Sequence, residues 1–160
     1  MIRWIRGLLH NMEISDFRKK VKQGSIVSVE GSNFNVREVV KFRLDDGSYY
    51  IKCFLNDGFV LADDENANAF LLVQKTETKF EEQFPNELSF QEKKFKFLYS
   101  AHAVAEQIKG EEIFKKGESE RFWDYKADDN SYLSLGVIDK TGKRMDLYGK
   151  IVKCKNVMIA

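Results

Sequence analysis

The sequence has little proline, cysteine and histidine and almost no net charge. Its 160 residues contain one proline, two cysteines and two histidines, and 26 basic residues balance 25 acidic ones to leave a formal charge of +1. This balance supplies no field that would draw the protein onto nucleic acid, so nucleic-acid binding is not expected. Cys53, Cys154, His10 and His102 lack any metal-ligand spacing, so we expect no disulfide framework, no metal site and no cofactor.

Long apolar runs and catalytic motifs are also missing. A membrane span needs about 20 apolar residues, which this chain does not offer, and no small-residue cleavage site follows the N-terminus as in a signal peptide. Phosphate-binding loops, dinucleotide-binding turns, serine-hydrolase elbows and zinc-protease motifs are all absent. His102, Asp124 and Ser134 have the residue types of a catalytic triad, but almost any sequence with one histidine in its body contains such a set by chance. We therefore do not expect an enzyme.

The N-terminus differs from the remainder of the chain. Residues 1–24 carry a net charge of +4 and residues 25–160 a net charge of −3. In helical projection, residues 1–12 place a wide apolar stripe opposite a basic face. Such a helix either packs on the body and covers a sheet edge, or lies on an anionic membrane surface or a protein partner. The residues expected to make the second kind of contact are Arg3, Trp4, Ile5, Arg6, Leu8 and Leu9.

A period of two replaces the helical period after Gly24. Asp46-Gly47 divides two alternating runs and predicts a tight hairpin turn, and Glu38 interrupts one run at a point where we expect a β-bulge. The segment 77–87, which holds Pro85, is expected to connect two halves. Strands are predicted at 25–30, 33–44, 49–55, 59–62, 70–73, 95–99, 121–125, 132–138, 144–148 and 151–159. The composition of residues 101–108 favours a helix, whereas their alternating alanines continue the strand pattern, so both remain open and the alternation favours a strand.

These elements predict a mainly β protein with an N-terminal amphipathic helix. Residues 44–50 resemble residues 127–133, which suggests two similar strand meanders. Many short strands with regular turns favour an antiparallel sandwich or a partly open barrel. We expect a helical leader at 1–24 and a single β-rich domain at 25–160, with halves at 25–76 and 87–160.

Aromatic side chains are numerous in the predicted strands. Most are expected to pack in the core, because aromatic residues dominate the cores of small β domains. In a barrel, however, about half would point inward and could line a ligand cavity. The residues expected at such a cavity are Trp123, Tyr125 and Tyr132. The acidic tract 63–65 lacks the spacing of a calcium loop and is expected to be a solvated loop.

Several short segments together resemble one protein family. They are K-Q-G-S-I-V at 22–27, F-N-V at 34–36, Y-Y-I-K-C-F-L at 49–55, G-F-V-L at 58–61, E-L-S-F at 87–90, F-W-D-Y at 122–125, Y-L-S-L at 132–135 and Y-G-K-I-V at 148–152. From about residue 22 to the C-terminus the chain resembles the bacterial domain-of-unknown-function family numbered 4178. The most specific piece is Trp123-Asp124-Tyr125 with Leu133-Ser134-Leu135, after which Gly136 stands where a glutamate is expected.

The resemblance implies a β-rich cytoplasmic domain without an assigned reaction. Members of the family tend to be encoded near membrane-stress proteins of the phage shock protein A type, which suggests an accessory role at the envelope. Our leading hypothesis is a non-enzymatic module in a bacterial cytoplasm, recruited to the inner membrane or to a protein partner by its N-terminus. A small-molecule-binding barrel is the alternative, and an enzyme of unknown reaction is the third hypothesis.

Overall fold

The computed structural model describes residues 12–110 and 114–160. The predicted amphipathic helix at 1–12 falls almost entirely outside this part of the chain. The predicted membrane or partner contacts, which are Arg3, Trp4, Ile5, Arg6, Leu8 and Leu9, therefore lie outside the described residues and stay predictions.

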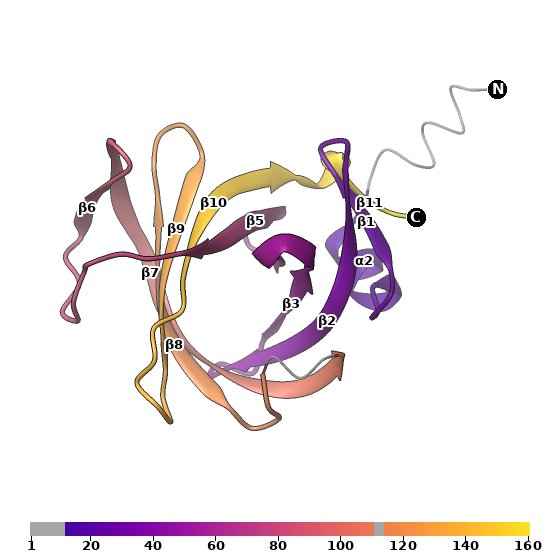
Figure 1. Cartoon of the computed structure of the whole chain (residues 1–160), viewed down its shortest axis with the longest axis horizontal. Coiled ribbons are helices and arrows are strands. Elements are labelled where there is room, and N and C mark those ends of the chain that lie inside the picture. The colour runs from indigo at the N-terminus through magenta and orange to yellow at the C-terminus, as the bar shows by residue number, and fades with distance from the viewer. Residues whose placement is uncertain (1–11, 111–113) are drawn as a thin grey trace.

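Eight antiparallel strands form a closed barrel, seen end-on in Figure 1. Each strand pairs with the next around the ring, and the pairing of the first with the last closes it. In order around the ring the strands are β2 (Ser32–Leu44), β3 (Tyr49–Leu55), β4 (Phe59–Asp64), β5 (Ala69–Thr76), β10 (Asp146–Lys153), β9 (Ser131–Ile138), β8 (Ser119–Lys126) and β7 (Lys93–Gly110). The prediction of a mainly β, antiparallel fold is confirmed. Of the two predicted forms, a sandwich and a partly open barrel, the structure shows a barrel, and the barrel is closed.

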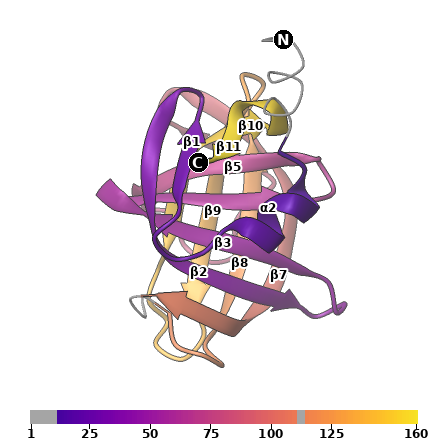
Figure 2. The same ribbon diagram turned by 90° about the vertical axis from the view of Figure 1, so that its right-hand side faces the viewer.

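Short elements cover the barrel from outside. β1 (Ile26–Val29) pairs with the first part of β2 and with β11 (Val157–Ile159), and together with the helix α2 (Ile14–Lys20) they lie on one side of the ring. Figure 2 shows α2 crossing the outer surface of the strands on that side. β6 (Glu87–Phe90) pairs with β7 and lies on the opposite side in Figure 1. The 3₁₀ turns η1 (Asn56–Gly58) and η2 (Cys154–Asn156) join β3 to β4 and β10 to β11.

Each predicted meander contributes four consecutive strands to the ring, β2 to β5 and β7 to β10. The repeated sequence forms the same turn twice. In the first copy the Leu44 amide donates to the Ser48 carbonyl, and in the second the Ala127 amide donates to the Ser131 carbonyl. The serine amide of each turn also bonds an aspartate carboxylate, at 2.9 Å in the first turn and 3.0 Å in the second. The similarity between 44–50 and 127–133 therefore reflects shared turn chemistry.

Most barrel strands are buried on both faces. One core lies inside the barrel, with Phe42, Phe54 and Phe122 among its members. A second core lies between α2, β1 and the outer faces of β3 to β5, where Phe17 packs edge-on against Phe70 with ring centroids 4.8 Å apart. A third lies between β6, the 77–86 connection and the outer faces of β8 to β10. The alternation of a strand thus distributes its side chains between two cores.

Bulges change which side chains face inward. The predicted irregularity at Glu38 is confirmed, since the β2–β3 register shifts between Val36 and Glu38. In β7 a second shift between Phe97 and Tyr99 reverses the alternation, so Phe97 contacts Tyr125 on the outside while Tyr99 faces inward. Residues 101–108 form a strand within β7, as predicted.

Two predicted boundaries are wrong. The strands expected at 144–148 and 151–159 are divided elsewhere, because β10 runs unbroken through Gly149 to Lys153 and the break falls at η2. Asp63 and Asp64 belong to β4 instead of a loop, with Asp63 buried beneath α2. Among the described residues, no helix has the length and apolar character needed to cross a bilayer.

At Gly149 the backbone of β10 leaves no room for a side chain against β5. A Cβ there would lie 2.0 Å from the Leu72 carbonyl oxygen, which the barrel wall holds in place. We expect Gly149→Ala to lower the free energy of unfolding by about 1–3 kcal/mol, as overpacking typically does. Urea denaturation measures the change. Lys153→Ala, at an exposed position of the same strand, should change stability by less than about 0.5 kcal/mol, and equal stability of the two variants would contradict the close approach.

A candidate binding cavity inside the barrel

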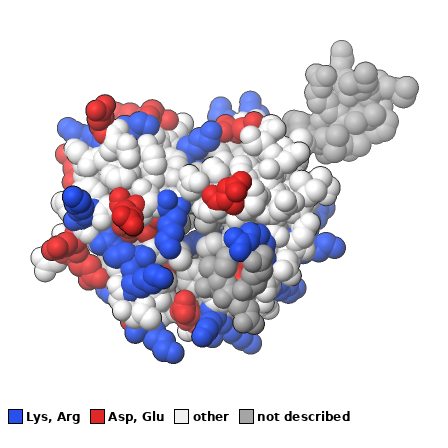
Figure 3. Space-filling view, viewed as in Figure 1, with Lys and Arg blue, Asp and Glu red and all other residues white. Residues whose placement is uncertain are grey.

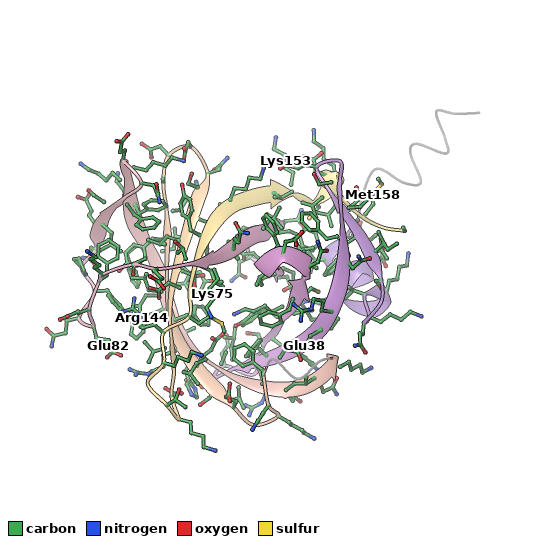
Figure 4. The ribbon with its side chains drawn as sticks, in the orientation of Figure 1. Glu38, Lys75, Glu82, Arg144, Lys153 and Met158 are labelled. Atoms are coloured by element: carbon green, nitrogen blue, oxygen red, sulfur yellow. The ribbon has the colours of Figure 1, made fainter. Side chains whose placement is uncertain are left out.

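One end of the barrel interior is closed by aromatic rings. The Phe114 ring packs edge-on against Phe42, with centroids 5.2 Å apart, and lies 5.6 Å from the Phe54 ring. The Phe114 amide donates to the carboxylate of Glu38, which is fully buried and is labelled on β2 in Figure 4. This end is packed and offers no room for a ligand.

The other half of the interior holds a cavity of about 300 Å³. It extends to the end of the barrel where the 45–48 and 65–68 turns join neighbouring strands. Tyrosines, carboxylates and small side chains line it. The lining residues are Arg18, Leu44, Asp46, Ser48, Tyr49, Tyr50, Lys52, Val60, Ala62, Asp63, Asp64, Glu65, Asn66, Leu71, Val73, Tyr99, Phe122, Asp124, Tyr132, Ser134 and Leu147.

A buried ion pair marks the middle of the interior. The ammonium of Lys52 on β3 lies 3.0 Å from the Glu120 carboxylate on β8, and both side chains are almost fully buried. The Tyr50 hydroxyl donates to the same carboxylate oxygen at 3.2 Å. The Lys52 nitrogen also lies 5.1 Å from the centroid of the Phe42 ring and 5.9 Å from that of Tyr50. Its charge is therefore balanced by one carboxylate and two aromatic faces.

Asp124 is another buried carboxylate, on the same face of β8 as Glu120. It accepts hydrogen bonds from the hydroxyls of Tyr132 and of Ser134, the latter at 2.6 Å. Burial raises the pKa of Asp124 to about 6, while these hydrogen bonds, the charge of Lys52 and the hydroxyl of Tyr99 oppose the rise. Near neutral pH the group is therefore a carboxylate that is held in a poorly solvated place.

Tyrosine hydroxyls serve as fixed donors around these carboxylates. Burial raises the pKa of Tyr50, Tyr99 and Tyr132 above the ordinary tyrosine value, and nearby carboxylates add to the rise. All three stay protonated at physiological pH and can donate to an acceptor. The interior therefore combines negative charge, donors and aromatic faces, which suits binding by charge-assisted hydrogen bonds.

The mouth of the cavity is built around α2. The Arg18 guanidinium lies 2.5 Å from the buried Asp63 carboxylate and 3.0 Å from that of Glu65. It also donates to the Tyr49 carbonyl and packs over the Tyr49 ring, 4.4 Å from its centroid. These contacts join the helix to the turns at the open end and fix the shape of the entrance.

The residues predicted to line a cavity lie on different faces. Tyr132 lines the cavity. Trp123 and Tyr125 face the outer core instead, where Phe84 packs edge-on against Trp123 and the Tyr125 hydroxyl donates to the Pro85 carbonyl. The reason is register, since Trp123 and Tyr125 alternate with Phe122 and Asp124, which point inward. Asp124 therefore lines the cavity, whereas the sequence analysis had predicted its neighbours Trp123 and Tyr125 there.

The hypothetical triad is not assembled. Asp124 and Ser134 meet inside the barrel, whereas His102 bonds to Asp45 at 2.9 Å and to Asp139 at 3.1 Å in a partly exposed network. Within the part of the chain that the structure describes, no three His, Cys, Asp or Glu side chains are placed to hold a metal ion. Both cysteines are free, and burial raises the pKa of the Cys53 thiol.

Lys52 and Glu120 were not singled out from the sequence. The apolar positions Ile51 and Cys53 indicate one buried face of β3, which makes the even-numbered Lys52 look solvent-exposed. Because α2 and β1 cover that odd-numbered face from outside, the even-numbered face becomes the barrel interior. The only hint in the sequence was that Lys52 lies between the aromatic residues Tyr50 and Phe54 on its own face.

The fold and the cavity define a class, namely a small closed antiparallel β-barrel with a polar cavity at one end. The family model for a domain of unknown function, DUF4178, matches residues 22–150. The chain therefore belongs to this family, as its motifs predicted. No curated protein and no solved structure gives a significant match to the chain.

The raised pKa of Asp124 predicts a specific pH dependence of stability. An acid with a higher pKa in the folded state stabilises the fold while it is protonated, so its contribution is present below about pH 4 and is lost as the pH rises through about 6. A shift from 3.8 to about 6 corresponds to about 3 kcal/mol. The unfolding free energy of wild type minus that of Asp124→Asn should fall by this order between about pH 4 and pH 7.

Urea denaturation at intervals over that range measures the difference. Asp128→Asn is the matched control, because Asp128 is exposed on the 127–130 turn and has no buried surroundings. If the free energies of unfolding of wild type and Asp124→Asn changed in parallel with pH, the Asp124 carboxyl would not be desolvated in the folded protein.

Proposed function

We propose that this domain is a non-enzymatic binding module that holds a small molecule in the open half of its barrel. The observation that carries the proposal is the buried Asp124 carboxylate at a cavity of about 300 Å³. A volume of this size is at the lower end of the range for small-molecule sites, about 300–1,000 Å³.

The inward residues of the barrel support this function. An eight-stranded barrel has an interior just wide enough to be filled by side chains or to hold one small ligand. Here Ala62 on β4 lines the cavity, and its small side chain leaves space at that end of the interior. Large rings fill the other end, where Phe54 lies against Phe114. The module thus has one packed half that supports one half with space for a ligand.

A second candidate function is recruitment to a membrane surface or a protein partner. It is favoured by the sequence of residues 1–12, which as a helix would place Trp4, Leu8 and Leu9 opposite Arg3 and Arg6. Apolar residues with an interfacial tryptophan and flanking arginines suit an anionic bilayer surface. This function is independent of the cavity, so one module can have both.

Ligand binding is tested with a fragment library on the ¹⁵N-labelled full chain. We expect some fragments at millimolar concentration to shift the amide resonances of Lys52, Asp124 and Ser134, which line the cavity. Ala62→Phe places a ring in the cavity. This variant should bind the same fragments at least tenfold more weakly, while the resonances of the rest of the protein stay unchanged. Absence of any cavity shift across the library, or equal shifts in Ala62→Phe, would refute the proposed function.

Flotation with liposomes tests the second candidate. The full chain should float with vesicles that contain anionic lipid and not with neutral vesicles at physiological salt, because both apolar burial and charge attraction contribute. Trp4→Ser should reduce the bound fraction severalfold. Lys153→Ser, an exposed change on the barrel, should leave it unchanged. If the full chain stays in the soluble fraction with both vesicle types, membrane recruitment is excluded.

A further inference from the structure

We propose that the cavity selects a primary ammonium group and that the Asp124 carboxylate receives it. The inference rests on the proposed function and goes beyond it by assigning the ligand's charge and its point of attachment. Its basis is a repeated arrangement inside the barrel, one copy of which is already occupied by an ammonium of the protein itself.

The occupied copy is the Lys52 site. The Lys52 ammonium has the Glu120 carboxylate at 3.0 Å and the ring centroids of Phe42 and Tyr50 at 5.1 Å and 5.9 Å. Its side chain is about nine-tenths buried. The barrel therefore tolerates a desolvated ammonium where a carboxylate and aromatic faces meet, which is the chemistry by which proteins recognise amine ligands.

The second copy has the carboxylate and the rings without an ammonium of its own. Asp124 follows Glu120 by four residues on the inner face of β8, about 13 Å along the strand, with Phe122 between them. The Tyr99 ring packs edge-on against Phe122, with centroids 6.0 Å apart, and Tyr132 completes the wall. Among the described residues, Asp124 has hydroxyl partners and no ion-pair partner.

The carboxylate has room for one more donor. Two carboxylate oxygens offer about four acceptor positions, and Asp124 receives hydrogen bonds from Tyr132 and Ser134, with the Tyr99 hydroxyl nearby. An ammonium from the cavity would take a remaining position and neutralise the buried charge. A ligand carboxylate would instead meet Asp124 with like charge in a poorly solvated site, which is unfavourable.

The charges of the side chains that line the cavity also favour a positively charged ligand. Five carboxylates line it and only two basic side chains, Arg18 and Lys52, do so. Both basic groups already have acidic partners, Asp63 and Glu65 for Arg18 and Glu120 for Lys52. The unbalanced carboxylates, which are Asp46 and Asp64 near the mouth and Asp124 within, give a negative entrance that attracts cations. The end of the barrel that faces the viewer in Figure 3 has no such bias, since basic and acidic residues are intermingled there.

A matched series of probes on the full chain tests the proposal. The probes are n-butylammonium, n-butanol and butanoate, which share a four-carbon chain and differ in charge. Binding is followed from the amide resonances of Lys52, Asp124 and Ser134 at about pH 7.5. We expect n-butylammonium to bind at least tenfold more tightly than either other probe, the discrimination that one charge-assisted hydrogen bond supplies.

Each result has a distinct meaning. Equal or tighter binding of n-butanol or butanoate at these resonances would overturn the charge assignment and leave the binding function in place. If none of the three probes shifts them, the charge assignment fails, and the fragment library described above decides the function separately. Shifts by n-butylammonium confined to residues outside the cavity would also overturn it.

Variants then locate the receiving group. Asp124→Asn should weaken n-butylammonium binding at least tenfold and leave n-butanol binding within about twofold. Asp128→Asn, which removes an exposed carboxylate outside the cavity, should leave both unchanged. Because the wild-type comparison of the three probes needs no variant, the proposal stays testable even if Asp124→Asn folds poorly. Retention of wild-type affinity by a folded Asp124→Asn would assign the ammonium to another carboxylate and refute the role of Asp124.

Discussion

The pairing of β2 with β7 is the constraint on which the structure depends. It joins the first strand of one meander to the first strand of the other and turns an open sheet into a barrel. The seam ends where Glu38 pairs with Gly110, and there a Cβ on Gly110 would lie 2.4 Å from the Arg37 carbonyl oxygen. The β2 bulge and a glycine are therefore both needed for the strands to meet at this point.

Closure determines what the interior can contain. Once the ring is complete, inward polar groups lose access to water except through the open end, so each must find a partner inside. Lys52 and Glu120 satisfy one another across the barrel. A buried pair of this kind is weak evidence for stability, because desolvation offsets much of the attraction. Its presence in the same interior as Asp124 supports the binding function proposed above more than it accounts for the stability of the fold.

Sequence patterns predicted most of the strands, the two aspartate turns and the bulge at Glu38, because these depend on neighbours along the chain, but they missed β6. They did not give the seam between β2 and β7, which joins residues about 65 positions apart. For the same reason they placed Trp123 and Tyr125 in the cavity and missed Lys52 and Glu120. Alternation divides a strand into two faces without saying which is the interior, and here both faces are buried. Only the external cover by α2, β1 and β6 decides between them.

That external cover also explains how so small a barrel can keep a cavity. The two outer cores completely bury large side chains such as Phe17, Phe70, Phe95 and Tyr125. This apolar burial outside the barrel offsets much of the stabilisation that is lost because the interior is not fully packed. With the wall held from outside and one end closed by Phe114, the inward side chains at the other end are free to serve binding. A site on rigid strands with fixed hydroxyl donors is preorganised, which lowers the entropic cost of taking up a ligand. The position of the cavity therefore follows from the way the fold is stabilised.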